Sequence, residues 1–362
     1  GVRLVGSEMC IRDRATAAPA NHSLSAQALA DYASAATFDA AKYDDPNAVM
    51  PTTGANNGLK LADLTGVAYD DPKWEQLLDE LTVNDLFSLT ADGGYHTVGV
   101  ESIGLSATED CDGPTGVHSN YNPAAGPSYP GSVMLACTWN QPLAKARGEQ
   151  IAKECAEINC AGWYAPAMNI HRSAFGGRNF EYYSEDPYVS GKIAAAMTKG
   201  VQKHRGKGTT IKHFIVNNQE DNRMGSDSIL SERTLREIYL KGFETAIRSA
   251  QPMAMMTSYN LINGVHAANN YDICTKAARD EWGFAGAIMT DWTTTTDSTA
   301  GECTAAGCMK AGNDMVMPGD MRDHASIRQA LKDGTLDIRE LKRCVYHTIK
   351  IILQSNQYED VK

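Results

Sequence analysis

Seven polar or aromatic residues stand at or just after the ends of short apolar runs in this sequence: Asp112, Lys212, His213, Tyr259, Asn260, Asp291 and Trp292. Carboxylate, ammonium and imidazole groups together can donate hydrogen bonds to a neutral ligand and accept them from it. An indole ring can also cover the apolar face of a sugar. The set therefore indicates a site for a small, hydroxyl-rich molecule.

Each of these residues has an ordinary structural explanation when it is taken alone. A Lys-His pair such as Lys212-His213 is usually a satisfied polar strand end, and a Tyr near a sheet edge usually packs. Their convergence is what favours a site. The run 286–292 (GAIMTDW) is central to it, because we expect a buried strand there that delivers Asp291 to a cleft.

The elements that would position these residues alternate between strand-like and helix-like stretches. The expected strands are 104–108, 132–137, 162–165, 209–214, 252–258, 286–290 and 314–317, and the expected helices are 143–158, 187–204, 231–249, 273–282, 323–331 and 338–353. A further helix is expected to begin near Pro72, capped by Asp71. Strands that are apolar on both faces predict a parallel sheet under a helical cover, and therefore an α/β fold.

A closed barrel explains the polar residues better than a doubly wound open sheet. About seven strands over roughly 250 residues fit a TIM-like (β/α)8 barrel with one strand altered or missing, and such a barrel places all strand C-terminal ends at one face. An open sheet would spread these ends along a line. No Gly-x-Gly-x-x-Gly follows a first strand, so the sequence does not support dinucleotide binding.

The composition narrows the range of partners. The net charge is -11 with Lys and Arg scattered, which argues against nucleic acid or an anionic membrane, since either would need a basic face. No apolar run approaches the roughly 20 residues that span a bilayer. The nine cysteines form no CxxC pair and lack zinc-ligand spacing. We therefore expect no metal, no cofactor, and free thiols in a reducing, cytoplasmic compartment.

Three regions differ in character. Residues 1–14 (GVRLVGSEMCIRDR) have no helix or strand period and resemble translated adapter DNA, so we expect a non-native stretch. Residues 15–71 are rich in Ala, Asn, Asp and Pro and are expected to form an extended linker, with one short helix near 25–33. Residues 72–362 are expected to form the barrel domain.

Eight segments carry a family resemblance. They read DGPTG from Asp112, NIHR from Asn169, GRNFEY from Gly177, SEDP from Ser184, KHF from Lys212, NQE from Asn218, SYN from Ser258 and MTDW from Met289. In order and spacing they resemble glycoside hydrolase family 3 β-glucosidases. The resemblance implies the catalytic barrel of a retaining β-glycosidase that hydrolyses terminal non-reducing β-D-glucosyl residues of a small carbohydrate.

By position, the resemblance implies that Asp291 is the nucleophile of a covalent glycosyl-enzyme intermediate. The implied substrate-binding residues are Asp112, Arg178, Lys212, His213, Tyr259 and Trp292, and possible additional site residues are Glu220 and Met256. Tyr259 is similar to the tyrosine that hydrogen-bonds the nucleophile. The physical logic agrees, because Lys212, Arg178 and a tyrosine hydroxyl would each favour the ionised form of Asp291.

The sequence departs from the family pattern in two respects. His118 stands where the family often has arginine. Retaining hydrolysis also needs a second carboxyl group roughly 5 Å from the nucleophile, and the stretch KHFIVNNQED from Lys212 lacks the Asp-His dyad of the single-domain members, which look like KHFPGHGDT. The resemblance implies that the acid lies on a separate α/β sandwich domain of the same polypeptide, placed upstream. Alternative acids are Glu185, Asp186, Glu220 and Asp221.

Other functions stay open. The barrel could bind a sugar without turning it over, or it could prefer xylose and act as a β-xylosidase. A more distant alternative is an aldolase that uses Lys212 as a Schiff-base amine. A covalent sugar on Asp291 would distinguish the glycosidase from the other two classes.

Overall fold

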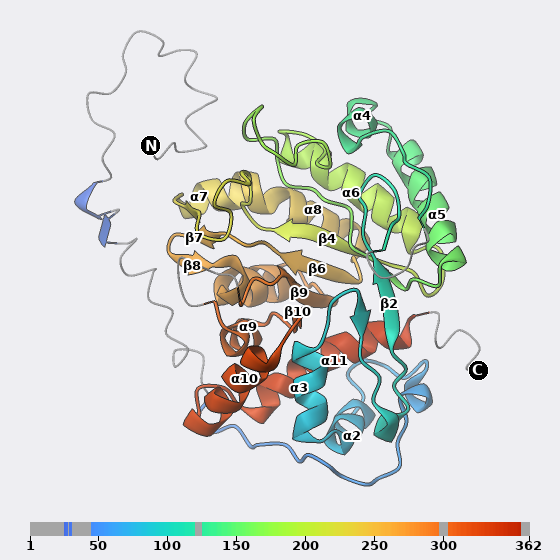
Figure 1. The fold of residues 1–362 in the computed structure, drawn as a ribbon, viewed down its shortest axis with the longest axis vertical. Helices are drawn as coiled ribbons and strands as arrows, with labels where there is room; N and C mark the ends of the chain where they lie inside the picture. The colour runs from blue at the N-terminus through green and yellow to red at the C-terminus, as the bar shows by residue number, and fades with distance from the viewer. Residues whose placement is uncertain (1–24, 28, 31–44, 120–124, 297–302, 356–362) are drawn as a thin grey trace.

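The computed structural model describes residues 25–27, 29–30, 45–119, 125–296 and 303–355, and it is organised around one curled sheet (Figure 1). In spatial order the strands are His96–Thr97 (β1), Thr108–Cys111 (β2), Gly162–Trp163 (β3), Gly208–Phe214 (β4), Ala254–Thr257 (β6), Ala287–Trp292 (β9) and Met315–Met317 (β10). β1 runs antiparallel to β2, and all later pairs are parallel. The predicted parallel α/β architecture is confirmed.

Helices cover the outside of this sheet. They are α2 (Lys73–Glu80), α3 (Val83–Ala91), α4 (Ser132–Cys137), α5 (Gln141–Glu157), α6 (Pro187–Val201), α7 (Glu232–Thr234), η6 (Leu235–Tyr239), α8 (Leu240–Ala250), η8 (Asp272–Glu281), α9 (Ala305–Ala311), α10 (Met321–Asp333) and α11 (Ile338–Leu353). Figure 1 shows α5, α6 and α8 on one side of the sheet and α2, α3 and α11 on the other. Polar side chains cap several N-termini, including the predicted cap Ser231 at α7.

Two strand predictions need correction. Residues 132–137 form helix α4, because Leu135 and Ala136 are buried while Met134 is 64% exposed, and a run of six residues does not distinguish helical from strand spacing. Residues 104–107 form a turn, in which Gly104 takes a left-handed φ of 63° and Val100 and Leu105 exchange two backbone hydrogen bonds of 2.9 Å. β2 therefore begins only at Thr108. The sequence pattern also did not indicate α3 and α9.

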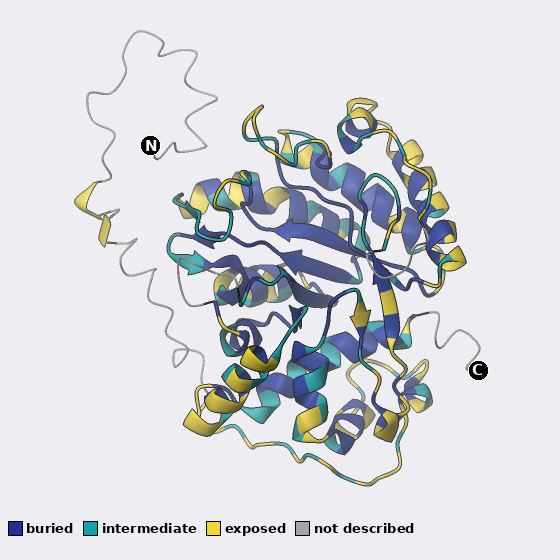
Figure 2. Cartoon of the chain, viewed as in Figure 1, coloured by how far each residue is buried: buried dark blue, intermediate teal, exposed yellow. Residues whose placement is uncertain are grey.

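Apolar side chains form a core on each side of the sheet, where Figure 2 shows the deepest burial. One core includes Trp163, Phe214 and Phe243 under α5, α6 and α8. The other includes Leu77 and Leu86 under α2, α3 and α11, and it also takes in Leu61 and Leu64. The last part of the segment expected to be a linker is therefore packed against the barrel. Residues 1–14 lie outside the described residues, as do residue 28 and residues 31–33 of the short helix expected at 25–33.

The turn that follows α3 packs directly against β10 and the end of β9. A Cβ on Gly93 would lie 2.3 Å from Met315 Sδ, and a Cβ on Gly94 would lie 2.9 Å from Trp292 Cζ3. Gly94 also has a positive φ of 108° and lies close to the Pro318 backbone, so a glycine is required there. The sheet thus curls round until its last strand faces the segment before β1, and the reversed β1 is the altered strand that the sequence led us to expect.

Two further findings concern the described residues only. The eight cysteines among them are all free thiols, and seven are buried. None of the described helices is both long and apolar enough to cross a membrane.

Candidate active site

Asp291 lies at the C-terminal end of β9, beside the ends of β6 and β10. Its side chain is 12% exposed. Oδ1 accepts the backbone N–H of Trp292 at 2.7 Å, whereas the buried Oδ2 has no well-aligned donor among the described residues. Burial raises the pKa of Asp291 above its usual value, although Arg178, Lys212, the Trp292 amide and the nearby Tyr259 hydroxyl favour the charged form. The cations act as expected, but burial outweighs them.

Lys212 and Asp112 form a partly buried ion pair at the ends of β4 and β2, in which the side chains are 3% and 23% exposed. Lys212 Nζ lies 2.6 Å from Asp112 Oδ1, which also accepts the Gly113 amide at 2.7 Å. Burial acts to raise the pKa of Asp112, but the Lys212 ammonium outweighs it and the pKa is lowered. His118 exchanges backbone hydrogen bonds of 2.8 and 3.0 Å with Asp112, so the position that departs from the family pattern lies directly beside this pair.

His213 follows Lys212 on β4 and is 1% exposed. Its backbone N–H donates to Asn169 Oδ1 at 2.7 Å, and its Nδ1 lies 3.3 Å from the same oxygen and 3.4 Å from the Tyr182 hydroxyl. Burial, together with Arg178 and Lys212, holds the pKa of His213 well below its usual value. The imidazole is therefore neutral near pH 7, and its Nε2 lies 3.7 Å from Asp291 Oδ2.

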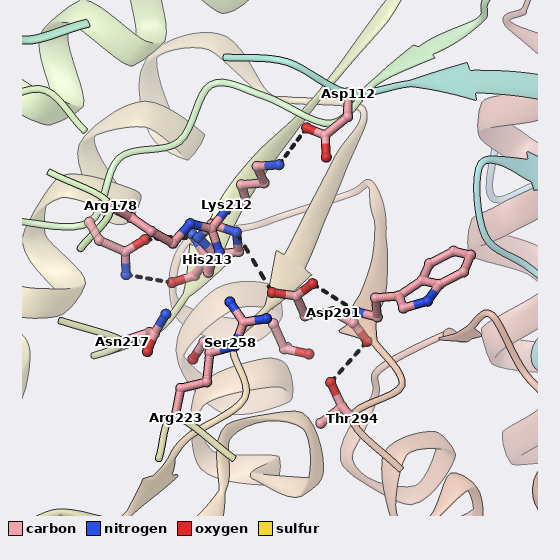
Figure 3. Close-up of polar contacts among 12 residues, drawn as sticks. Asp112, Arg178, Lys212, His213, Asn217, Arg223, Ser258, Asp291 and Thr294 are labelled. Atoms are coloured by element: carbon pink, nitrogen blue, oxygen red, sulfur yellow. Dashed lines mark hydrogen bonds and ion pairs between the residues drawn. The ribbon is translucent and has the colours of Figure 1, made fainter. Parts of the chain in front are cut away.

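Arg178 reaches the site from the loop that follows β3. Its Nε donates to Glu181 Oε1 in an ion pair. Burial acts to lower the pKa of Arg178, but the Tyr182, Glu181 and Asp291 side chains raise it overall. Figure 3 shows Arg178 and His213 on the same side of Asp291, with Lys212 extending to Asp112. Arg178 is thus a permanent cation held in place near the proposed nucleophile.

Tyr259 follows β6 and is almost fully buried, and burial with the Asp291 carboxylate raises its pKa. The Arg223 guanidinium lies 4.4 Å above its ring. Arg223 Nη1 also binds Glu220 Oε2 at 2.9 Å, and Glu220 Oε1 accepts the Asn217 amide at 3.3 Å. Glu220 is thus the ion-pair partner of Arg223, a site residue that sequence reasoning missed. The one sequence signal for Arg223 was its place in the loop that also carries Glu220.

Met256 lies within one buried cluster, and Trp292 packs against the edge of the same cluster. The Trp292 ring is partly exposed and lies 5.4 Å from the ring of Tyr95, a second residue that the sequence did not indicate. The Tyr95 hydroxyl donates to Asp112 Oδ2 at 3.3 Å. Met256 is buried in the barrel interior, where it packs in a cluster with Tyr164, Ala254, Met289, Met315 and Met317. Met256 therefore lies among core side chains, while Trp292 lies at the mouth.

Two of the four alternative acids already have structural partners. The Asp186 carboxylate caps α6 by accepting the backbone N–H groups of Tyr188 and Val189 at 2.7 and 3.4 Å. Glu220 is held by Arg223 and Asn217. Glu185 and Asp221 are exposed. Among the residues that the structure describes, no group of three His, Cys, Asp or Glu side chains could hold a metal ion.

The arrangement suits a hydroxyl-rich ring and one reactive carboxylate. Asp112 can accept hydrogen bonds, Lys212 and Arg178 can donate them, and neutral His213 can do either. Asp291 Oδ2 faces His213 Nε2 at 3.7 Å and has no well-aligned hydrogen-bond donor among the described residues. Such a site can bind a sugar and bring its anomeric carbon to a nucleophile.

Known proteins share this sequence and fold. The family described as Glycosyl hydrolase family 3 N terminal domain matches residues 100–351. β-Glucosidase A of Butyrivibrio fibrisolvens is 43% identical over 230 residues, which are 60% of this chain and 27% of that protein. Exo-α-(1→6)-L-arabinopyranosidase of Bifidobacterium breve is 38% identical over 284 residues, which are 75% of this chain and 36% of that protein.

Solved structures agree with the sequence matches. β-Glucosidase 3B from Thermotoga neapolitana, in complex with α-D-glucose, has a TM-score of 0.73 at 36% identity, over 80% of this chain and 44% of that chain. A β-glucosidase from Paenibacillus barengoltzii has a TM-score of 0.78 at 34% identity, over 87% and 36% of the two chains. The chain thus spans less than half the length of each of these relatives.

The family match covers most of the chain, and the similarity to a solved β-glucosidase extends over 80% of it. The predicted TIM-like fold and the predicted resemblance to β-glucosidases are therefore confirmed. The chain belongs to glycosyl hydrolase family 3.

Proposed function

We propose that this chain is the nucleophile-bearing barrel of a retaining β-glycosidase that acts on terminal β-D-glucosyl residues. The observation that carries the proposal is the state of Asp291 Oδ2, a buried carboxylate oxygen with no well-aligned donor among the described residues. Structural carboxylates in protein interiors are normally saturated with hydrogen bonds, because an unpaired buried charge is costly. A bond from Oδ2 to an anomeric carbon would remove that cost.

In the proposed reaction, Asp291 Oδ2 attacks the anomeric carbon while the bond to the leaving oxygen breaks. The electron pair of that bond passes to the leaving oxygen, which takes a proton from an acid. Water then attacks the anomeric carbon and gives a proton to the conjugate base of that acid, while the bond to Asp291 breaks and its electron pair returns to the carboxylate. The Asp112–Lys212 pair, Arg178 and neutral His213 would hold the sugar hydroxyls through both steps, and Trp292 would cover one side of the ring.

We further infer that the proton donor belongs to a separate domain of the same polypeptide. Asp186 and Glu220 already have structural roles, which supports this inference. The relatives are also much longer than the region they share with this chain. A barrel without the acid would react with substrates whose leaving group needs no proton, and it would be slower on others by about 10²–10⁴-fold.

A 2,4-dinitrophenyl 2-deoxy-2-fluoro-β-D-glucoside tests the nucleophile, because its leaving group departs without protonation. We expect intact-mass analysis to show one covalent sugar and peptide mapping to place it on Asp291. The matched control is Asp291→Asn, which keeps the shape of the side chain and should form no adduct. Folded protein that binds glucose by calorimetry but forms no adduct would show a sugar-binding barrel instead.

Which sugar ring the proposed site prefers is a separate question. The relatives include several β-glucosidases and an exo-α-(1→6)-L-arabinopyranosidase, whose named sugar is a pentose ring without a hydroxymethyl group. The pentose-specific alternative, an arabinopyranoside or xyloside substrate, therefore stays a candidate. Comparison of kcat/KM for dinitrophenyl β-D-glucoside, β-D-xyloside and α-L-arabinopyranoside decides between them, and we expect the glucoside to be fastest.

A further inference from the structure

Asp110 is a buried carboxylate inside the barrel that has none of the roles described above. It lies two residues before Asp112 on β2, so both side chains lie on the same face of that strand. It is 7% exposed. Its Oδ1 accepts the backbone N–H of Gly162 at 2.8 Å, and its Oδ2 accepts the hydroxyl of Tyr164 at 3.1 Å. Both oxygens are therefore bound to the segment that begins with β3.

Hydrogen bonds lead from Asp110 to the mouth of the barrel. The Tyr164 hydroxyl, which donates to Asp110, also accepts the backbone N–H of Tyr95 at 2.9 Å. The Tyr95 hydroxyl donates to Asp112 Oδ2 at 3.3 Å, and the Tyr95 ring lies 5.4 Å from the Trp292 ring. Tyr95 has a left-handed φ of 55°, which residues with a side chain rarely adopt, so its placement depends on such contacts.

We propose that Asp110, in its ionised form, is a positioning residue of the sugar site: through Tyr164 it fixes Tyr95, which in turn holds Asp112 and Trp292 in place. The inference rests on the proposed function and deepens it. An ionised carboxylate can only accept, so the Tyr164 hydroxyl must donate to it and keeps a lone pair for the Tyr95 N–H. If Asp110 Oδ2 carried a proton, it would donate to the Tyr164 oxygen and compete with Tyr95 for it.

Three segments bring titratable side chains close to Asp110. Exposed His96 on β1 favours the ionised form, its neighbour Glu109 on β2 opposes it, and Tyr164 after β3 stabilises it by donating. The other side chains nearby in the barrel interior are neutral and include Thr97, Thr108, Met289 and Met315. Burial is the strongest influence and raises the pKa of Asp110 to about 6. Acidification through pH 6 should therefore weaken sugar binding.

Calorimetry with glucose between pH 5 and pH 8 tests the proposal in the whole chain. We expect wild-type affinity to fall about three- to tenfold on acidification, the equivalent of one lost oriented hydrogen bond. Asp110→Asn imitates the protonated acid, since its amide donates to Tyr164 at every pH, so it should bind weakly with a flat profile. Tyr164→Phe should behave in the same way. Because His96 favours the ionised form of Asp110, the control His96→Gln should keep the pH dependence with its midpoint moved to higher pH.

Thermal unfolding over the same pH range provides the second readout, which needs no sugar. The folded-state pKa of Asp110 is raised, so wild-type stability should fall relative to Asp110→Asn as the pH rises from 4 to 6. Such a difference in stability would show that the variant is folded and that Asp110 titrates. Sugar binding by Asp110→Asn with wild-type affinity and pH profile would overturn this proposal alone. Absence of sugar binding to the folded wild type at every pH would overturn the proposed function as well.

Discussion

Lys212 is the residue whose charge matters most to the stability of the site. Its ammonium is 3% exposed, and Asp112 is the carboxylate that it contacts, at 2.6 Å. An ion pair in such a place balances a large desolvation cost against a large Coulomb attraction. Each charge is tolerated because the other is present. The pair joins the ends of β2 and β4, so it also fixes two of the proposed sugar-binding side chains relative to each other.

Lys212→Met is expected to lower the free energy of unfolding at pH 7 by about 2–4 kcal/mol, because Asp112 would keep a partly buried charge without its cation. Lys212 lowers the folded-state pKa of Asp112, so the stabilisation is present above the unfolded carboxyl pKa and is lost as the pH falls through the folded value. The difference between variant and wild type should therefore shrink from pH 7 to pH 3.5. Urea unfolding at both pH values measures it.

The exposed Lys203 offers a control for this measurement. Lys203→Met should change the free energy of unfolding by less than about 0.5 kcal/mol at either pH. A Lys212→Met variant as stable as wild type at pH 7 would mean that the ion pair contributes nothing net, and the assignment of Lys212 as a site-fixing cation would be wrong.

Helix α6 shows how an element limits the chemistry that its residues can do. The helix begins after Asp186, and that carboxylate satisfies two of the backbone N–H groups that a helix leaves without partners. A carboxylate held in this way already serves as the cap of the helix. Within the SEDP motif, Asp186 therefore has a structural role as a helix cap. The family resemblance of the motif does not reveal this role.

Asp186→Ala is expected to lower the free energy of unfolding by about 1 kcal/mol through loss of the cap. It should leave both the covalent labelling of Asp291 and the turnover of unactivated glucosides unchanged. The neighbouring Glu185→Ala, which removes an exposed carboxylate, is the matched control and should change neither property. A selective loss of turnover on unactivated glucosides in Asp186→Ala would identify Asp186 as the acid and contradict the two-domain mechanism.

Across the whole molecule, the two ends of the barrel have different tasks. The C-terminal ends of the strands carry the proposed sugar site, whereas at the opposite end Thr348 and Ile352 of α11 line one cavity with Gly208 and Ala287, which begin β4 and β9. Asp314 links three elements at this end of the barrel. The fully buried carboxylate binds Arg279 Nη2 at 2.6 Å, His347 Nδ1 at 2.9 Å and the Ile288 amide at 2.7 Å. It thus connects α11 and η8 with β9, the strand that ends in Asp291.

Acid stability should depend on this end of the barrel. Burial lowers the pKa of His347 to about 4, even though Asp314 opposes the shift. Since the unfolded chain binds a proton at a higher pH, wild-type stability should fall as the pH drops from about 6.5 to about 4, by up to about 3 kcal/mol from this group. His347→Gln keeps a hydrogen-bond donor but cannot titrate, so its stability should decline less steeply in urea unfolding at pH 7, 5.5 and 4.5.

The control for the His347→Gln measurement is a histidine outside the core. His96→Gln, at an exposed position, should follow the wild-type decline. Equal slopes for His347→Gln and wild type would show that His347 does not couple protonation to unfolding.

Local sequence signals predicted much of the framework. Helix α11 has the predicted limits, because an amphipathic repeat and the cap Asp337 are both local features. Asp291, Asp112, Lys212 and His213 were predicted as a set, because each follows an apolar strand and parallel strands end at one face. Residues 132–137 were predicted wrongly, because a short apolar run fits either a helix or a strand until its neighbours determine which side is buried.

The residues that sequence reasoning missed share one property, which is that long-range contacts define their roles. Arg223 belongs to the site because it lies over Tyr259, and Tyr95 belongs to it because Asp110, Asp112 and Tyr164 bind it. Neither residue follows a strand of the predicted set or stands in one of the eight segments. The spacing of residues along the sequence does not indicate long-range contacts of this kind.

The sequence by itself determined which chemical groups this protein has and at which strand ends they stand. It thereby established the α/β fold, the family and the identity of the proposed nucleophile. Only the tertiary structure decided the electrostatic state of that group. Asp291 is buried deeply enough for desolvation to outweigh two cations, and its Oδ2 is left without a well-aligned donor among the described residues. Burial sums contributions from segments far apart in the chain, so it exists only once they have packed together.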